Sequence, residues 1–122
     1  MRTRAIDPTT TSYAQAFEVE GPSRWLFVSG QVPAHGDGGV PQTFGDQCRP
    51  AWANVERQLS AAGMGLDNLV KVTIFLSDRL YRDENMRIRH EVLAGRTPAL
   101  TVIITGIYDE AWLLEIEAVA AA

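Results

Sequence analysis

Hydrophobic and polar positions alternate most clearly near the end of the chain, over residues 112–120. One side of this stretch is apolar throughout and consists of Trp112, Leu114, Ile116 and Ala118. The other side carries two carboxylates, Glu115 and Glu117, which a strand would hold about 7 Å apart. Such alternation is typical of a strand with one buried face. Either both glutamates face water, or one lines a cleft and handles protons.

Four more segments are predicted to be strands. Residues 13–19 and 69–76 alternate, and residues 25–32 and 98–107 are continuous apolar runs bounded by turn residues. A Gly-Pro-Ser turn at 21–23 separates the first two strands, which we therefore expect to form a hairpin. Residues 1–12 are polar and rich in threonine, and we expect an extended lead-in there.

Helical spacing predicts two helices. The first begins at Thr43 or Asp46 and runs to about residue 62, with Gly63 as its stop; its apolar stripe is Cys48, Trp52, Val55, Leu59 and Ala62. The second begins at Ser77 or Asp78 and runs to about residue 94. Asn85 falls on its apolar stripe with Tyr81, Ile88 and Val92, whereas the charged positions, Arg89 included, are assigned to solvent.

The resulting order, β-β-α-β-α-β-β, predicts an α+β single domain over residues 1–122, with two helices on one face of a mixed sheet. Trp25, Phe27 and Phe75 make the other face apolar as well. Two small helices cannot cover both faces, so we expect the second face to be buried in a homo-oligomer.

Composition and charge exclude several classes. A net charge of −4 argues against a dedicated nucleic-acid binder. The single cysteine, Cys48, allows no disulfide within the chain and is expected to be a small core residue. No apolar run is long enough to span a membrane and the first residues lack a signal-peptide core, so a cytoplasmic protein is expected. His35 and His90 have no ligand partners at suitable spacing, and no metal site is predicted.

Two polar residues in apolar settings are candidates for chemistry. Ser29 precedes Gly30 inside an apolar strand, where its hydroxyl either bonds locally or points into a cleft. The glycine indicates a close backbone approach or a bulge. Asn85 is either a buried amide bonded to the backbone or a substrate contact. Composition and spacing reach no further than this.

Several motifs resemble the YjgF/RidA family, also called UK114 or L-PSP endoribonuclease. They are Val-Ser-Gly-Gln-Val-Pro at 28–33, Ala-Ala-Gly at 61–63, Leu-Val-Lys-Val-Thr-Ile-Phe-Leu at 69–76, Asn85, Pro98-Ala99, and Glu-Ile-Glu-Ala at 115–118. The resemblance extends from about Tyr13 to the end of the chain, with the motifs in the same order and spacing.

The resemblance implies a chorismate-mutase-like fold and a homotrimer around a central barrel, with ligand clefts between subunits. It also implies hydrolysis of reactive enamines or imines, such as 2-aminoacrylate, to 2-oxo acids and ammonia without a metal or organic cofactor. By position, Tyr13 and Ser29 would line the cleft, Asn85 would support it, and Glu115 would orient or activate water.

One departure from the family pattern bears on the substrate. The deaminase pattern Pro-Ala-Arg-Ser, whose arginine binds the substrate carboxylate, is Pro98-Ala99-Leu100-Thr101 here, so Leu100 and Thr101 occupy these substrate-binding positions. This indicates a branch without the arginine, unless nearby Arg96 replaces it. Three functions stay open: enamine or imine hydrolysis, non-catalytic binding of a small metabolite by a trimer, and, as the family's older name suggests, RNA cleavage.

Overall fold

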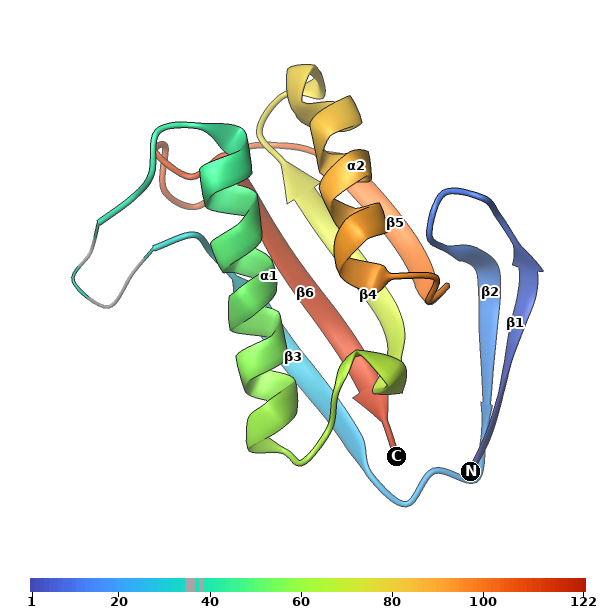
Figure 1. Cartoon of the computed structure of the whole chain (residues 1–122). Coiled ribbons are helices and arrows are strands. Elements are labelled where there is room, and N and C mark those ends of the chain that lie inside the picture. Colours follow the sequence, from blue (N-terminus) through green and yellow to red (C-terminus); the bar gives the residue numbers. More distant parts are fainter. Residues whose placement is uncertain (35–36, 38) are drawn as a thin grey trace.

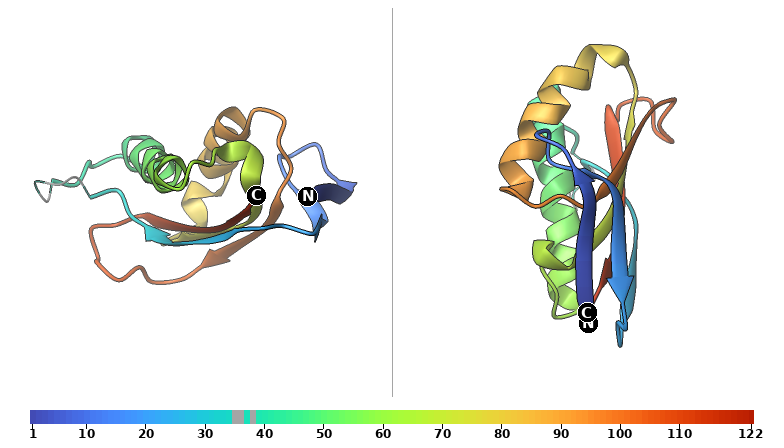
Figure 2. Two further views of the ribbon diagram at one scale, coloured as in Figure 1. Left: turned by 90° about the horizontal axis from the view of Figure 1, so that it is seen from below. Right: turned by 90° about the vertical axis from the view of Figure 1, so that its right-hand side faces the viewer.

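The computed structural model, which describes residues 1–34, 37 and 39–122, has two layers, one of helices and one of strands (Figure 1). Six strands form one mixed sheet in the order β1-β2-β5-β4-β6-β3. Their bounds are Arg2–Pro8 (β1), Ala14–Glu20 (β2), Trp25–Gln31 (β3), Leu69–Leu76 (β4), Ala99–Ile104 (β5) and Leu114–Ala121 (β6). Helices α1 (Phe44–Ala61) and α2 (Arg82–Leu93) cover the same face of this sheet, as predicted (Figure 2).

The core lies between the helices and the middle of the sheet. Central strand β4 pairs in parallel with β5 and antiparallel with β6. Alternation directs Ile74 of β4 and Ile116 of β6 toward the helices, where both are fully buried against a cluster that includes Trp52 and Leu59 of α1. Burying each such aliphatic side chain contributes about 1.5–3 kcal/mol, which makes this seam the main source of stability.

The helix ends follow the predicted signals, with one shift. Thr43 caps α1 by accepting a hydrogen bond from the backbone N–H of Asp46, and Gly63 follows the helix with a φ of +70°. Asp78 caps a 3-10 turn (Arg79–Tyr81) by accepting from the N–H of Leu80 at 2.8 Å. Helix α2 therefore begins at Arg82, later than the predicted start at Ser77 or Asp78.

Residues 1–12 are not only a lead-in, because they include strand β1. This strand pairs antiparallel with β2 at one end of the sheet (Figure 1, right). Its side chains are largely exposed, and Arg4 contacts Glu18 across the pair at 3.3 Å. A charged edge strand of this kind lacks the apolar alternation by which strands are recognised in a sequence.

The predicted hairpin between residues 13–19 and 25–32, which correspond to β2 and β3, is wrong. Strand β2 pairs with β1 and meets β5 through Ala14 and Ala99, whereas β3 pairs with β6 at the opposite edge of the sheet. The segment after β2 is held by the end of the chain, since the N–H groups of Ser23 and Arg24 both donate to the carbonyl of Ala122. These bonds direct the chain toward β6, with which β3 pairs, and not back along β2.

The sheet face opposite the helices is uncovered and partly apolar (Figure 2). We call it the open face. Phe27 is 75% exposed and Trp25 is 50% exposed on β3, and Lys71, Thr73 and Glu117 follow on the neighbouring strands. The predicted position of Trp25, Phe27 and Phe75 on this second face is confirmed. No helix in the described part of the chain is long and apolar enough to cross a membrane.

Candidate functional site

The candidate residues separate into two groups on opposite faces of the sheet. Leu100 of β5 is in register with Val72 of β4, which is buried beneath the helices, so Leu100 faces the helix side. Glu115 of β6 is in register with Phe75, whose side alternates with that of buried Ile74 and Leu76, so Glu115 belongs to the open face. Within one chain, the sheet separates the two groups.

The helix-side group surrounds a cavity of about 570 Å³ between α2, β5 and the start of β2. We call it the α2 cavity. Three of the predicted site residues line it together, namely Tyr13, Asn85 and Leu100. The other lining residues are Thr11, Gln15, Arg79, Arg82, Met86, Arg89, Val102 and Ile104. The cavity thus combines an apolar wall from β5 with polar groups from α2 and β2.

Asn85 is 2% exposed, and its Oδ1 atom has no hydrogen-bond partner among the described residues. The side chain lies on the buried stripe of α2, as predicted, beside the fully buried Ile88. A buried amide oxygen without a donor costs about 1–3 kcal/mol. Because Oδ1 has no donor in the described chain, the arrangement favours Asn85 as a substrate contact over a buried amide bonded to the backbone.

Arg89 was assigned to solvent by the sequence pattern, and this is wrong. The side chain is 4% exposed and lines the α2 cavity. Its Nη2 donates to the carbonyl of Thr11 at 2.8 Å, while its buried Nε has no partner among the described residues. Burial lowers the pKa of Arg89, because desolvation penalises the charged guanidinium. The spacing of four residues from Asn85 was the signal that places both side chains on one helix face.

Glu115 occupies a half-buried position against β3. Its carboxylate lies over Gly30, where an added methyl group would overlap Oε2 and lie 2.8 Å from Cγ. The bulge predicted as one alternative at Gly30 is confirmed, because the pairing of β3 with β6 shifts register between Val28 and Gln31. The close approach at Gly30 is made by the Glu115 side chain and not by a backbone. Glu115 also lines a small pocket of about 320 Å³ with Phe75 and Tyr108. A site for this carboxylate exists because the facing residue lacks a side chain.

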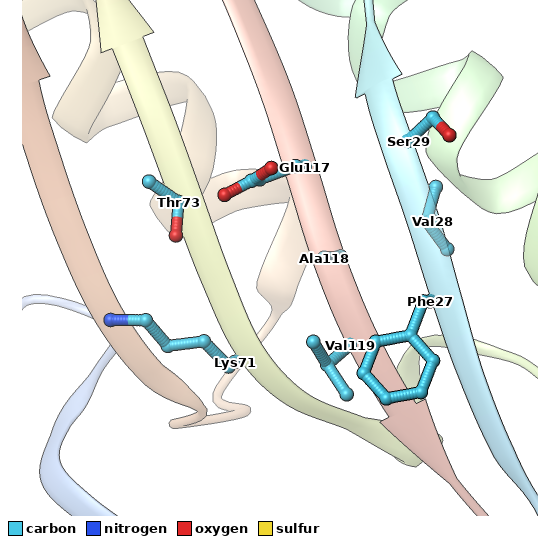
Figure 3. A pocket seen from close by; sticks show the side chains of 8 residues that line it. All are labelled: Phe27, Val28, Ser29, Lys71, Thr73, Glu117, Ala118 and Val119. Atoms are coloured by element: carbon cyan, nitrogen blue, oxygen red, sulfur yellow. The ribbon is translucent and has the colours of Figure 1, made fainter.

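Ser29 and Glu117 line a separate groove of about 340 Å³ on the open face (Figure 3). Glu117 is exposed and lies opposite Thr73 of β4. Lys71 lies in the same groove and donates from Nζ to the Oγ1 of Thr101 at 2.6 Å. The Thr101 side chain is thus hydrogen-bonded on the open face, whereas Leu100, the residue before it, faces the helices.

The remaining candidates lie away from both groups. Arg96 donates from Nε to Asp67 at 2.6 Å and from Nη1 to the carbonyl of Leu93, and it does not line the α2 cavity. Cys48 is fully buried, as predicted, and burial raises its pKa to about 12. Over residues 1–34, 37 and 39–122, no group of three or more metal-binding side chains is arranged to hold an ion. His35 lies outside the described residues.

Comparison with known proteins decides the family. A family model described as endoribonuclease L-PSP matches residues 3–122, nearly the whole chain. The chain belongs to the L-PSP family. A RutC family protein of Pyrococcus horikoshii is 30% identical over 110 residues, covering 88% of this chain and 85% of its own length. The mitochondrial protein mmf1 of Schizosaccharomyces pombe is 33% identical over 91 residues. These residues make up 75% of this chain and 54% of that relative.

Solved structures of L-PSP family relatives share the fold. The crystal structure of yeast Mmf1 is 25% identical and superposes with a TM-score of 0.76, covering 98% of each chain. A Rid family protein of unknown function from Yersinia pestis, YyfB, is 22% identical and superposes with a TM-score of 0.86 over 100% of both chains. The second likeness concerns the fold alone, and together they confirm the predicted α+β fold of the single chain.

Proposed function

We propose that this L-PSP family protein hydrolyses a reactive enamine or imine to a carbonyl compound and ammonia in a cleft between two copies of the chain. The observation that carries the proposal is the split site. Tyr13, Asn85 and Leu100 line the α2 cavity, whereas Glu115 lies on the other side of the sheet. A second copy whose open face meets the cavity edge would bring the two halves together.

The chemistry assigned to Glu115 is proton transfer to and from water. An enamine first gains a proton at carbon and loses one from nitrogen, which gives the imine. The carboxylate then accepts a proton from water as the oxygen attacks the C=N carbon and returns it to the nitrogen, which leaves as ammonia, so that imine and water yield carbonyl compound and ammonia. A half-buried carboxylate held over Gly30 supports this role better than the exposed Glu117.

The proposed assembly is a homotrimer, as the family resemblance implies, with the open faces buried around its axis. The exposed Trp25 and Phe27 support this arrangement, because apolar side chains of that size are usually covered by a partner. We also place the chain in a branch without the family arginine, since Leu100 stands at that position.

The test is release of 2-oxo acid from enzymatically generated 2-aminoacrylate, measured above the spontaneous rate. Because positioned proton transfer contributes about 10²- to 10⁴-fold, Glu115→Gln is expected to lower turnover by about 100-fold or more. The matched control is Glu117→Gln, an exposed carboxylate on the same face, which should stay near the native rate. Native turnover no faster than the spontaneous reaction would overturn the proposal. Equal rates in the native protein and Glu115→Gln would overturn the role of Glu115.

A second candidate function is non-catalytic binding of a small metabolite. The apolar wall of the α2 cavity, made by Leu100, Val102 and Ile104, favours it. Recovery of an unchanged ligand after long incubation would support this function over hydrolysis. RNA cleavage, the activity in the family's older name, is disfavoured by the net charge of −4.

A further inference from the structure

Arg89 carries a buried positive charge that the rest of the described chain does not neutralise. It is 4% exposed, and no carboxylate forms an ion pair with it among residues 1–34, 37 and 39–122. Its one hydrogen bond goes to a neutral acceptor, the carbonyl of Thr11. A buried charge is costly unless it is paired, so this position suits an anion that is not part of the chain.

The side chains that line the cavity with Arg89 include further positive charges. Arg79 and Arg82, both exposed, also line the α2 cavity, and no Asp or Glu of the described chain lines it, although Arg82 pairs with Asp83 outside the lining at 3.5 Å. This contrasts with the net charge of −4 for the whole protein. A concave surface with one sign of charge raises the local concentration of counter-ions, and here these would be anions.

Beside Arg89, which needs a hydrogen-bond acceptor, Asn85 needs a hydrogen-bond donor. Its buried Oδ1 is an acceptor without a donor, one helical turn before Arg89 on the same face of α2. A ligand that satisfies both residues needs an anionic group for the guanidinium and an N–H donor for the amide oxygen. Leu100, Val102 and Ile104 offer the remainder of the ligand an apolar wall.

We propose that the α2 cavity is a carboxylate-binding site in which Arg89, supplied by the helix, is the anchor. The ligand class is a small aliphatic carboxylate with a nitrogen donor next to the carboxylate. Arg89 would thereby determine specificity, and the loss of arginine at Leu100 would not exclude carboxylate substrates. The identification of this ligand with the substrate rests on the proposed function; the binding site itself does not.

Calorimetric titration of the intact protein tests the site without any turnover. The probes are N-acetylleucine, whose N–H donor lies next to its carboxylate, its neutral analogue N-acetylleucinamide, which keeps that donor, and inorganic phosphate. We expect the carboxylate to bind at least about tenfold more tightly than the amide. Arg89→Met should abolish this difference, while Arg87→Met, an exposed arginine on the same helix, should keep it.

A second variant guards against misfolding of Arg89→Met. Leu100→Trp keeps the guanidinium but fills the cavity, and it should also abolish carboxylate binding. Three results would overturn the inference: equal binding of carboxylate and amide, binding of phosphate in preference to the carboxylate, or undiminished carboxylate binding by Arg89→Met. Absence of binding to the native protein would overturn it as well.

The two proposals fail separately. A protein that binds N-acetylleucine through Arg89 but does not hydrolyse 2-aminoacrylate retains the carboxylate site and loses the hydrolase function. A protein whose Arg89→Met variant hydrolyses 2-aminoacrylate with native KM retains the function and loses the anchor.

Discussion

At the scale of single residues, the Glu115 carboxylate can occupy its position only because residue 30 is a glycine and has no side chain there. Gly30→Ala would introduce a methyl group where Oε2 of Glu115 now lies. The carboxylate can rotate away, so the fold should persist with a small change in melting temperature, while 2-aminoacrylate turnover falls by about tenfold or more. Gly65→Ala, where the added methyl group has open space, is the control. Unchanged turnover in Gly30→Ala would show that the location of this carboxylate does not matter.

Cys48 gives a prediction about pH. Burial raises the pKa of its thiol from 9.0 to about 12, so above pH 9 the unfolded chain releases this proton while the folded chain keeps it. The free energy of unfolding therefore falls between pH 9 and pH 12 by this contribution. Cys48→Ala should show a shallower decline in chemical denaturation over that range. Parallel pH profiles for the two proteins would contradict the assignment.

The residue scale also shows what a sequence can reveal about the site. Asn85 and Gly30 could be selected because each breaks a local pattern: an amide on an apolar stripe and a glycine in a strand. The alternation makes Glu115 and Glu117 equivalent, and only the family resemblance selects Glu115. Arg89 could not be selected, since an arginine among charged helix positions is usually solvated and only the packing of Thr11 over it reveals its burial.

At the scale of elements, Gln47 joins helix α1 to the segment that immediately precedes β6. Its side chain is buried and fully bonded: Nε2 donates to the carbonyls of Pro41 and Ala111, and Oε1 accepts from the N–H of Leu113. Gln47→Met keeps the length of the side chain but leaves these backbone groups unsatisfied, and should cost about 2–4 kcal/mol of unfolding free energy.

Denaturant unfolding of Gln47→Met beside Gln58→Met measures this contribution. Gln58 is exposed on the same helix, and its replacement should change stability little. A loss below about 1 kcal/mol for Gln47→Met would mean that water replaces the bonds and that α1 is not held in this way.

Elements were predictable where burial imposes a period, as in α1, β4 and β6. Strand β1 and the partner of β2 were not, because both depend on contacts between distant parts of the chain. The two ion pairs from β1 to β2 join exposed residues, and the bonds of Ser23 and Arg24 go to the last residue of the chain. Neither leaves a local signal in the sequence.

At the scale of the whole molecule, the open face predicts self-association. Phe27→Glu places a charge at a side chain that is 75% exposed on this face, and should convert the assembly to the 13.4 kDa chain. Light scattering during gel filtration measures the mass. Leu80→Glu, on the 3-10 turn and 80% exposed, is the control and should keep the native assembly. A native protein that is already monomeric at micromolar concentration would contradict the prediction.

The most direct test of the central claim, a catalytic site shared between two copies, is complementation. Glu115→Ala removes the open-face half of the site and Leu100→Trp blocks the α2 cavity, so each variant alone should be inactive toward 2-aminoacrylate. When equal amounts are refolded together, about one quarter of the sites combine an intact glutamate with an intact cavity, and about one quarter of native activity should return. Activity that stays at the level of the separate variants would contradict a shared site.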